Sequence, residues 1–451
     1  MAGIFKSYDV RGIVPTQLTT GDAYRIGKAT AAYLKAKVLA VGRDARISSP
    51  DLQAALMAGV CSTGCDVLDL GMGPTPISYF AAGALGGKRC QGAVQTTASH
   101  NPSEYGGFKF TKAEAHPMSH GQGLEVVEEL FKADQPVLAK KSGKVKQVNL
   151  WPAYYKHCRR FADLDKRHPL KVAIDTGNGV MGAHLPALLK GLPIKAVPLF
   201  WKPDGRFPNH EANPLKLENL RDLQEAVVKQ KCDLGAAFDG DGDRVAFVDE
   251  KGTAIPGDVA GALMALELLK REKPGAAVLY DVRATRALAE AVNEAGGRAI
   301  ETRVGHSHIK ASLRREKAVM AAELSGHYYF RDFYSSDSGE TAFFLLLSLL
   351  SRGGKKISEL VAPLMRYHHS GEINFHVSDA AKALAAIETK YGAAAKNLSK
   401  ADGVTLDLGS WWFNLRMSNT EPVVRLNLES TASKDEMKAK VAELTAAIQG
   451  A

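Results

Sequence analysis

The sequence contains little cysteine, and this narrows the classes of protein to which it can belong. Among 451 residues there are five cysteines: Cys61, Cys65, Cys90, Cys158 and Cys232. Their number is odd and their spacing matches no zinc-binding pattern, which argues against a disulfide scaffold and against a structural zinc site. Buried thiols in a reducing compartment fit this usage best, so we expect a cytoplasmic protein.

A hydrophobic run long enough to cross a membrane is also missing. The longest run, Ala342 to Leu350, is far shorter than the ~20 residues that a spanning helix needs. Asp337 and Glu340 before it and Gly353-Gly354 after it are typical of helix ends, so we interpret it as a buried core helix that stops before Gly353. The first twelve residues do not resemble a signal peptide, and we expect no membrane partner.

The chain has an excess of positive charge, but this charge is not concentrated in a segment that predicts a binding site. The net charge is +9, from 58 basic and 49 acidic residues, and such a balance raises nucleic acid as a partner. The basic residues are dispersed, however, and the densest cluster, Lys140 to Lys146, lies where we expect a linker. We therefore expect no nucleic-acid partner and attribute the excess charge to the attraction of small anions.

The most informative segment that is present surrounds Ser99. It runs from Thr96 to Pro102 and continues through Gly106-Gly107 to Lys109. No G-x-S-x-G elbow surrounds the serine, and an unassisted hydroxyl is a weak nucleophile. A serine that carries a phosphoryl group instead needs backbone N–H groups and cations, which this turn can supply. The alternative is a surface serine in a polar loop.

A second segment, Phe238 to Arg244, alternates three aspartates with glycines. Alternation directs the carboxylates to one side, and hard oxygen ligands of this kind suit Mg²⁺. A solvated acidic turn is one alternative. An EF-hand, with Glu250 at its twelfth position, fails because Arg244 replaces the central glycine and because the flanks resemble strands instead of helices. A P-loop fails because the segment lacks the G-x-x-x-x-G-K-[ST] pattern.

These two segments resemble the phosphoserine and metal-binding loops of the α-D-phosphohexomutases, the superfamily that includes phosphomannomutase, phosphoglucomutase and phosphoglucosamine mutase. Glu323 to His327 is similar to its sugar-specificity loop, and Arg416 to Arg425 to its C-terminal phosphate-binding loop. The motifs occur in the family's order, beginning with Tyr8 to Gly12. The continuation His327 to Phe333 and the Ser-Asn-Thr of the phosphate loop resemble the bacterial phosphomannomutases and phosphomannomutase/phosphoglucomutases.

The resemblance implies reversible phosphoryl transfer between C1 and C6 of a hexose phosphate, through a phosphoserine and a hexose 1,6-bisphosphate that also serves as activator. The residues implied in catalysis are Ser99, His100, Lys109, Arg11 and Arg244. The implied Mg²⁺ ligands are Asp239, Asp241, Asp243 and the phosphate on Ser99. The implied substrate contacts are Tyr8, Arg283, His306, Glu323, Ser325, His327, Arg416, Ser418, Asn419, Thr420 and Arg425.

Two departures from the family pattern affect sugar recognition. Ala322 stands where the family usually has glycine, and Arg283 where many relatives have lysine, which keeps the charge but changes its geometry. Two other functions stay open: a phosphoglucosamine mutase, and a non-catalytic sugar-phosphate-binding protein. We expect hexose phosphates as the small-molecule partners and a monomer or weak dimer.

The chain is organised as repeated α/β units. Three segments, 38–44, 172–179 and 277–281, share an apolar strand that ends near an aspartate and leads into a turn and a helix, so we predict three similar α/β domains. Beyond Glu372 shorter strands predict a smaller α+β domain, and the resemblance implies a TATA-binding-protein-like fold and a central cleft. We expect domains at residues 1–147, 148–250, 251–368 and 369–451, with a hinge at His368 to Gly371 that lets the last domain move.

Overall fold

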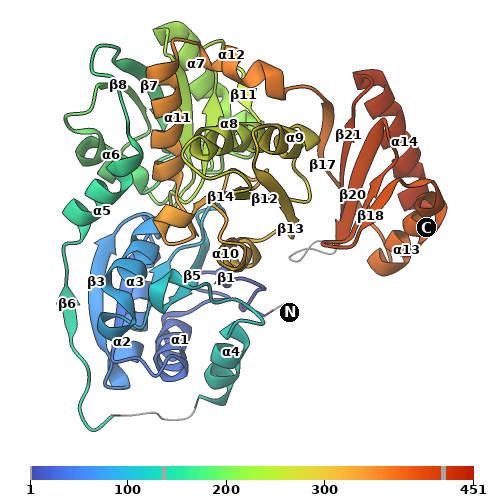
Figure 1. Cartoon of the computed structure of the whole chain (residues 1–451). Coiled ribbons are helices and arrows are strands. Elements are labelled where there is room, and N and C mark those ends of the chain that lie inside the picture. The colour runs from blue at the N-terminus through green and yellow to red at the C-terminus, as the bar shows by residue number, and fades with distance from the viewer. Residues whose placement is uncertain (1–2, 135–138, 418–422, 451) are drawn as a thin grey trace.

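The computed structural model describes residues 3–134, 139–417 and 423–450 and contains four β-sheets in chain order (Figure 1). Helices pack on the first three sheets, and the fourth sheet stands beside them at the C-terminal end of the chain, drawn in orange and red. The expected fold class, three α/β domains followed by a smaller α+β domain, is confirmed. Ser418, Asn419 and Thr420, expected to contact a phosphate, lie outside the described residues.

The first domain contains β1 (Val10–Ile13), α1 (Thr20–Tyr33), β2 (Val38–Arg43), α2 (Ser49–Ser62), β3 (Asp66–Met72), α3 (Thr75–Arg89), β4 (Gly92–Thr96), β5 (Tyr105–Lys112), α4 (Leu124–Ala133) and β6 (Val145–Gln147). Its sheet has the order β1-β5-β4-β2-β3-β6. Helices α1, α2 and α4 contribute side chains to one apolar cluster and α3 to another, so they cover opposite faces of the sheet.

The second domain contains α5 (Trp151–Cys158), β7 (Leu170–Asp175), α6 (Met181–Leu189), β8 (Ile194–Leu199), α7 (Arg221–Gln230), β9 (Leu234–Phe238), β10 (Val245–Val248) and β11 (Ala254–Ile255). Its sheet has the order β11-β10-β9-β7-β8. Because β11 pairs with β10, this sheet extends to Ile255, past the expected domain boundary at residue 250.

The third domain contains α8 (Gly257–Leu269), β12 (Ala277–Asp281), α9 (Arg286–Glu294), β13 (Arg298–Thr302), α10 (His306–Arg315), β14 (Met320–Ala322), β15 (Tyr328–Phe330), β16 (Ser336–Asp337), α11 (Gly339–Gly353) and α12 (Ile357–Val361). Its sheet has the order β13-β12-β14-β15-β16. The expected core helix is α11, which Ser338 caps at its start; it includes Gly353 and ends at Gly354, whose φ of 61° stops the helix.

The three α/β domains repeat one strand pattern. In each, a central strand (β2, β7 or β12) pairs in parallel with the next two strands of the repeat, and the last of these pairs antiparallel with a fourth. The connection between the third and fourth strands therefore begins at the carboxyl end of a parallel strand, where open α/β sheets place their ligands. The loops that hold Ser99, the three aspartates and Glu323 are these three connections.

The C-terminal domain contains β17 (His368–His376), α13 (Ala380–Tyr391), β18 (Asn397–Ser399), β19 (Val404–Asp407), β20 (Trp411–Met417), β21 (Val423–Ser430) and α14 (Lys434–Gln449). The sheet is antiparallel throughout, in the order β17-β21-β20-β19-β18.

The expected position of the hinge is wrong. His368 and His369 are paired with Ser430 and Glu429 of β21, so they belong to the sheet of the C-terminal domain. The chain crosses between domains just before them, over residues 365–367. The apolar-polar pattern of this segment does not reveal the strand, because β17 here runs into an irregularity of register between His369 and Glu372.

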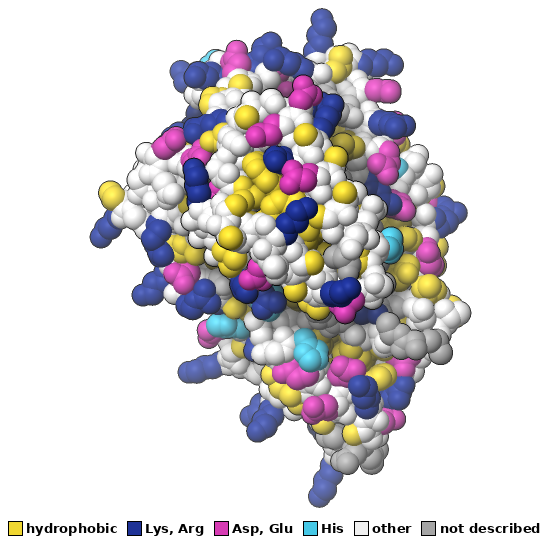
Figure 2. All heavy atoms as spheres, turned by 90° about the vertical axis from the view of Figure 1, so that its right-hand side faces the viewer, with side chains coloured by type: hydrophobic (Ala, Val, Ile, Leu, Met, Phe, Trp, Pro, Cys, Tyr) yellow, Lys and Arg dark blue, Asp and Glu magenta, His cyan; other side chains and the backbone are white. Residues whose placement is uncertain are grey.

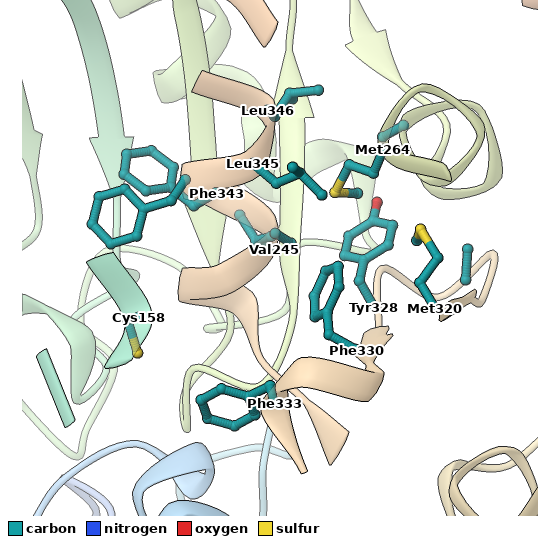
Figure 3. Packing of buried hydrophobic residues seen from close by; sticks show 14 of the residues in the cluster. Cys158, Val245, Met264, Met320, Tyr328, Phe330, Phe333, Phe343, Leu345 and Leu346 are labelled. Carbon is teal, nitrogen blue, oxygen red and sulfur yellow. The ribbon is translucent and has the colours of Figure 1, made fainter. Parts of the chain in front are cut away.

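The buried core is divided in the same way. One continuous apolar cluster joins the first three domains, with members such as Phe80, Phe247 and Phe344. Figure 3 shows part of it around α11, where Phe343 and Leu345 point to opposite sides of the helix. The C-terminal domain has its own cluster, centred on Phe413. The first three domains are thus one packed body, and the fourth is a separate one.

The length of the helices and the distribution of surface charge agree with the expectations from composition. Within the described ranges, no helix is both long and apolar enough to span a bilayer. On the face of the C-terminal domain that looks toward the viewer in Figure 2, Lys and Arg side chains are interspersed with Asp and Glu. Positive charge is therefore dispersed on this face, as the sequence predicts.

Because the C-terminal domain has its own core, we expect residues 368–451 to fold when produced alone. Circular dichroism and a cooperative thermal transition are the measurement. Phe413→Ala in the same fragment is the control: this buried ring lies in the cluster, and its loss should cost about 3–5 kcal/mol. A fragment without cooperative unfolding would show that this domain depends on the other three.

Candidate active site

Ser99 lies at the carboxyl end of β4 in a loop that holds it in an unusual conformation. Its φ of 51° is left-handed, and its side chain is fully buried. The hydroxyl donates a hydrogen bond to Asp239 Oδ2 at 3.1 Å, and His100 Nδ1 lies 3.4 Å from Ser99 Oγ. A left-handed serine costs of order 1 kcal/mol, so the surroundings must enforce this geometry.

Arg46, which sequence analysis did not single out, enforces it. This fully buried guanidinium donates to Asp44 through Nε at 3.2 Å. Its four remaining N–H groups bond the loop's backbone carbonyls, those of Ser99 (2.8 Å), Asn101 (2.6 Å), Pro102 (2.6 Å) and Tyr105 (3.0 Å). All five N–H donors of the Arg46 guanidinium are used, so this side chain fixes the backbone of the Ser99 loop. In the sequence, the only indication of this role is the position of Arg46 just after β2.

The three aspartates of the second loop lie between β9 and β10 and are buried together. Ligand oxygens of Asp239, Asp241 and Asp243 lie within 4.8 Å of one another. Thr75 donates to Asp241 Oδ2 at 2.5 Å, while Asp241 Oδ1 is buried with no hydrogen-bond partner among the described residues. An unpartnered carboxylate oxygen in a cluster of three fits a Mg²⁺ site.

Cations from the first domain surround this cluster. The Lys109 ammonium donates to Asp241 at 2.7 Å and also contacts Asp243. Burial alone would lower the pKa of Lys109, but the aspartates outweigh it and raise the pKa above its usual value. Arg11 is paired with Asp9 at 2.8 Å and bonds the Asn101 side chain.

The aspartates at the two ends of the cluster have pKa values shifted in opposite directions. Burial, together with Asp241 and Asp243, raises the pKa of Asp239 well above its ordinary range, and Arg244, 3.8 Å away, offsets this only in part. Burial would also raise the pKa of Asp243, but Lys109 and His327 outweigh it and hold the pKa well below the ordinary range. The site thus needs additional positive charge near Asp239 before all three aspartates can ionise.

The sugar loop reaches the metal loop through His327. Its Nε2 lies 3.3 Å from Asp243 and its Nδ1 3.1 Å from Glu323. Burial and Arg244 would lower the pKa of His327, but Asp243 and Glu323 outweigh them and raise it to about 9. His327 therefore joins a metal-ligand candidate of the second domain to a sugar-contact candidate of the third, and its Nε2 also lies 3.1 Å from Arg244 Nε.

Glu323 itself is more enclosed than expected for a sugar contact. It accepts hydrogen bonds from Tyr329 Oη at 2.6 Å and from Gly305 N at 3.1 Å, and it is buried. Ser325, half-buried, lines a cavity of about 1130 Å³ together with Arg283.

Tyr8 and His306 meet where the first domain contacts the start of α10. The Tyr8 hydroxyl donates to the Val304 carbonyl at 3.2 Å, and its ring centroid lies 5.4 Å from that of His306. This contact sets the N-terminal motif beside the third domain.

Two arginines of the C-terminal domain, Arg416 and Arg425, lie side by side. We call this pair the clamp. Arg416 of β20 is directly opposite Arg425 of β21. Glu372 of β17, which sequence analysis did not identify, accepts from Arg416 at 2.7 Å and from Arg425 at 3.0 Å. Arg283 lies 3.6 Å from Glu372 and 3.8 Å from Glu323.

Several of the expected site residues, together with Glu372, thus form one connected series of contacts. It begins at Ser99 and the aspartate cluster, passes through His327 and Glu323, and continues through Arg283 and Glu372 to the clamp arginines. All four domains contribute to it.

Comparisons with known proteins agree with this arrangement. The four models of phosphoglucomutase/phosphomannomutase, alpha/beta/alpha domains I, II and III and the C-terminal domain, match residues 2–137, 152–252, 256–367 and 372–447. A phosphomannomutase of Salmonella montevideo is 39% identical over 98% of this chain and 97% of its own. A phosphomannomutase/phosphoglucomutase of Pseudomonas aeruginosa is 38% identical over 96% and 93%. The crystal structure of a phosphoglucomutase/phosphomannomutase family protein from Burkholderia thailandensis superimposes with a TM-score of 0.90 at 34% identity, covering 99% and 96%.

If the aspartate cluster binds Mg²⁺, adding Mg²⁺ should raise the melting temperature, because a ligand that binds only the folded state stabilises it. Asp241→Asn, which removes one ligand charge, should stay folded and lose this shift. Asp222→Asn, an exposed aspartate on α7, is the matched control and should keep it. A full shift in Asp241→Asn, or none in the unmodified protein, would show that the cluster is structural.

Proposed function

This chain belongs to the phosphoglucomutase/phosphomannomutase family, and we propose that it interconverts the 1-phosphate and 6-phosphate of a hexose through a phosphorylated Ser99. Mannose phosphates are the proposed substrates, with glucose phosphates accepted as well. The observation that carries the proposal is the placement of the Ser99 hydroxyl, buried 3.1 Å from Asp239 and 3.4 Å from His100, with Lys109 on the neighbouring carboxylates.

The proposed first half-reaction moves the phosphoryl group from Ser99 to the sugar. The bond between phosphorus and Ser99 Oγ breaks as the C6 hydroxyl oxygen of a hexose 1-phosphate bonds to phosphorus, giving the 1,6-bisphosphate. Charge spreads over the equatorial oxygens, so positioning and cations supply most of the catalysis. Lys109 and Arg11 are the cations of the first domain proposed to stabilise this charge.

The proton of the attacking hydroxyl ends on Ser99 Oγ, and His100 is the group placed to pass it. Burial, with Arg244, Arg11 and Lys109 nearby, lowers the pKa of His100 well below its ordinary value. A neutral imidazole at neutral pH can accept the proton from the hydroxyl and return it to the serine oxygen.

Asp239, Asp241 and Asp243 would hold Mg²⁺ together with an oxygen of the serine phosphate. When bound, the ion supplies neutralisation of the phosphoryl charge. The protein's own contribution is to keep the three carboxylates together, with Thr75 orienting Asp241.

The other phosphate of the sugar belongs in the proposed clamp of Arg416 and Arg425. Guanidinium groups bind a phosphate by two parallel hydrogen bonds and do not distinguish C1 from C6. The bisphosphate can therefore turn around, place its C1 phosphate at Ser99 and return that group to the serine. Arg283, Ser325 and Glu323 are the proposed contacts of the sugar ring; Arg283 lies 3.8 Å from Glu323 and lines a cavity together with Ser325.

The phosphoglucosamine mutase and the non-catalytic binder have less support. The relatives at 38–39% identity carry the names phosphomannomutase and phosphomannomutase/phosphoglucomutase, and Ser99 is accompanied by every expected cation and carboxylate of its site. A coupled assay on mannose, glucose and glucosamine 1-phosphates, with glucose 1,6-bisphosphate as the proposed activator, separates the three.

We expect Ser99→Ala to lower kcat by at least about a thousandfold, because it removes the oxygen proposed to carry the phosphoryl group. Binding of mannose 1-phosphate should persist, since the clamp lies in another domain. Ser103→Ala, in the same loop but exposed, is the control and should be fully active. Substantial turnover by Ser99→Ala would refute the phosphoserine mechanism.

We also expect the C-terminal domain to close on the other three when substrate binds. Throughout the described part of the chain, the hydrogen bonds and ion pairs that join residues 372–450 to earlier domains go to the third domain, for example from Thr285 to Glu429 at 2.5 Å. Small-angle scattering with and without mannose 1-phosphate would detect closure as a smaller radius of gyration.

Closure should be lost in Arg416→Ala, because a ligand shifts a conformational equilibrium only through contacts that are better in the favoured state. An unchanged scattering curve for the saturated, unmodified protein would rule out the movement.

A further inference from the structure

Glu372 occupies a position in the phosphate clamp that the proposed mechanism does not use. It follows the register shift in β17, next to Gly371, whose φ of 72° is left-handed. An irregularity of this kind turns a side chain away from the direction that a regular strand would give it. Here the result is that a carboxylate reaches the two arginines of β20 and β21.

The arginines need such a partner when no phosphate is bound. Arg416 and Arg425 are directly opposite on an antiparallel pair, where like charges destabilise the sheet. Each oxygen of the Glu372 carboxylate takes one of them, Oε2 that of Arg416 and Oε1 that of Arg425. Burial would raise the pKa of Glu372, but Arg283, Arg416 and Arg425 outweigh it and lower the pKa, so the carboxylate is ionised at neutral pH.

The same carboxylate leaves part of the clamp available. Arg416 is 2% exposed, and its Nε has no hydrogen-bond partner among the described residues. A buried guanidinium with an unused donor has capacity to bind a further anion. Glu372 and Arg283 both line the cavity of about 1130 Å³, so the carboxylate that pairs with the two arginines also faces open space.

We propose that Glu372 is a positioning residue that holds Arg416 and Arg425 in the phosphate-free clamp and weakens the clamp's grip on phosphate enough for the bisphosphate to turn around. The inference rests on the proposed function, because turning is required only of a mutase. A dianionic phosphate at the clamp interacts with two arginines and is repelled by one carboxylate. Without that carboxylate the phosphate would bind more tightly and leave more slowly.

The proposal predicts that Glu372→Gln binds phosphate more tightly and has a lower kcat than the unmodified protein. Removal of one negative charge next to the phosphate should tighten the binding of inorganic phosphate and of mannose 1-phosphate about tenfold, or ~1.4 kcal/mol. The KM for mannose 1-phosphate should fall, and kcat should fall with it, because the intermediate leaves the clamp more slowly. A residue that only supported the fold would weaken binding instead.

Calorimetric titration of the full chain with inorganic phosphate tests the charge effect without requiring turnover. Glu372→Asp keeps the charge and should bind phosphate with an affinity near that of the unmodified protein. Glu443→Gln, a glutamate on α14 in the same domain but away from the clamp, should leave both affinity and kcat unchanged. Thermal melting of each variant checks that it is folded.

The outcomes are distinct. Tighter phosphate binding with a lower kcat in Glu372→Gln supports the proposal. Unchanged or weaker binding by the folded variant overturns it, whatever the activity. If Glu372→Gln does not fold, weaker phosphate binding by folded Glu372→Asp than by Glu443→Gln also overturns it, and equal binding supports it. Loss of mutase activity in the unmodified protein would instead count against the proposed function, and phosphate titration would still report on the clamp.

Discussion

The constraint on which the rest of the structure depends is the burial of three carboxylates at one point. Asp239, Asp241 and Asp243 come from a loop of the second domain, and that domain alone does not neutralise them. Lys109 comes from the first domain and His327 from the third. Leaving a buried charge without its partner costs about 3–5 kcal/mol, so the loop is stable only where both neighbours lie against it. The three domains must therefore pack together for the site to form, and the site in turn favours their packing.

The repeated strand pattern explains how three separate domains can meet that requirement. In each, the connection from the third to the fourth strand leaves the carboxyl end of a parallel strand, and these connections carry Ser99, the aspartates and Glu323. The shared apolar cluster holds the three domains in one body, so the loops keep their distances. The C-terminal domain has a core of its own, as expected of the part of the site that we propose to move.

Much of this could be predicted from the sequence, because motif residues adjacent along the chain report local chemistry. The strands around the aspartate loop and the α11 core helix followed from apolar patterns and flanking glycines. Arg46 could not be predicted, since its role depends on four carbonyls more than 50 residues away. Glu372 and the crossing of the chain into the C-terminal domain were hidden for a related reason: the register of β17 against β21 determines both, and register is a property of the paired sheet.

The two proposed phosphate positions differ in their fixed charges, and on the proposed mechanism the two ends of the bisphosphate would therefore be held differently. The Ser99 end faces three buried carboxylates, so a phosphate there depends on Lys109, the surrounding cations and a bound metal ion. The clamp end has two arginines and one carboxylate, and attracts phosphate without a metal. On the proposed mechanism, a phosphate that leaves Ser99 would move away from three carboxylates, while the other phosphate would stay with the two arginines. Such an asymmetry lets the sugar detach at one end without being lost from the other, which is the physical condition for turning around within the cleft.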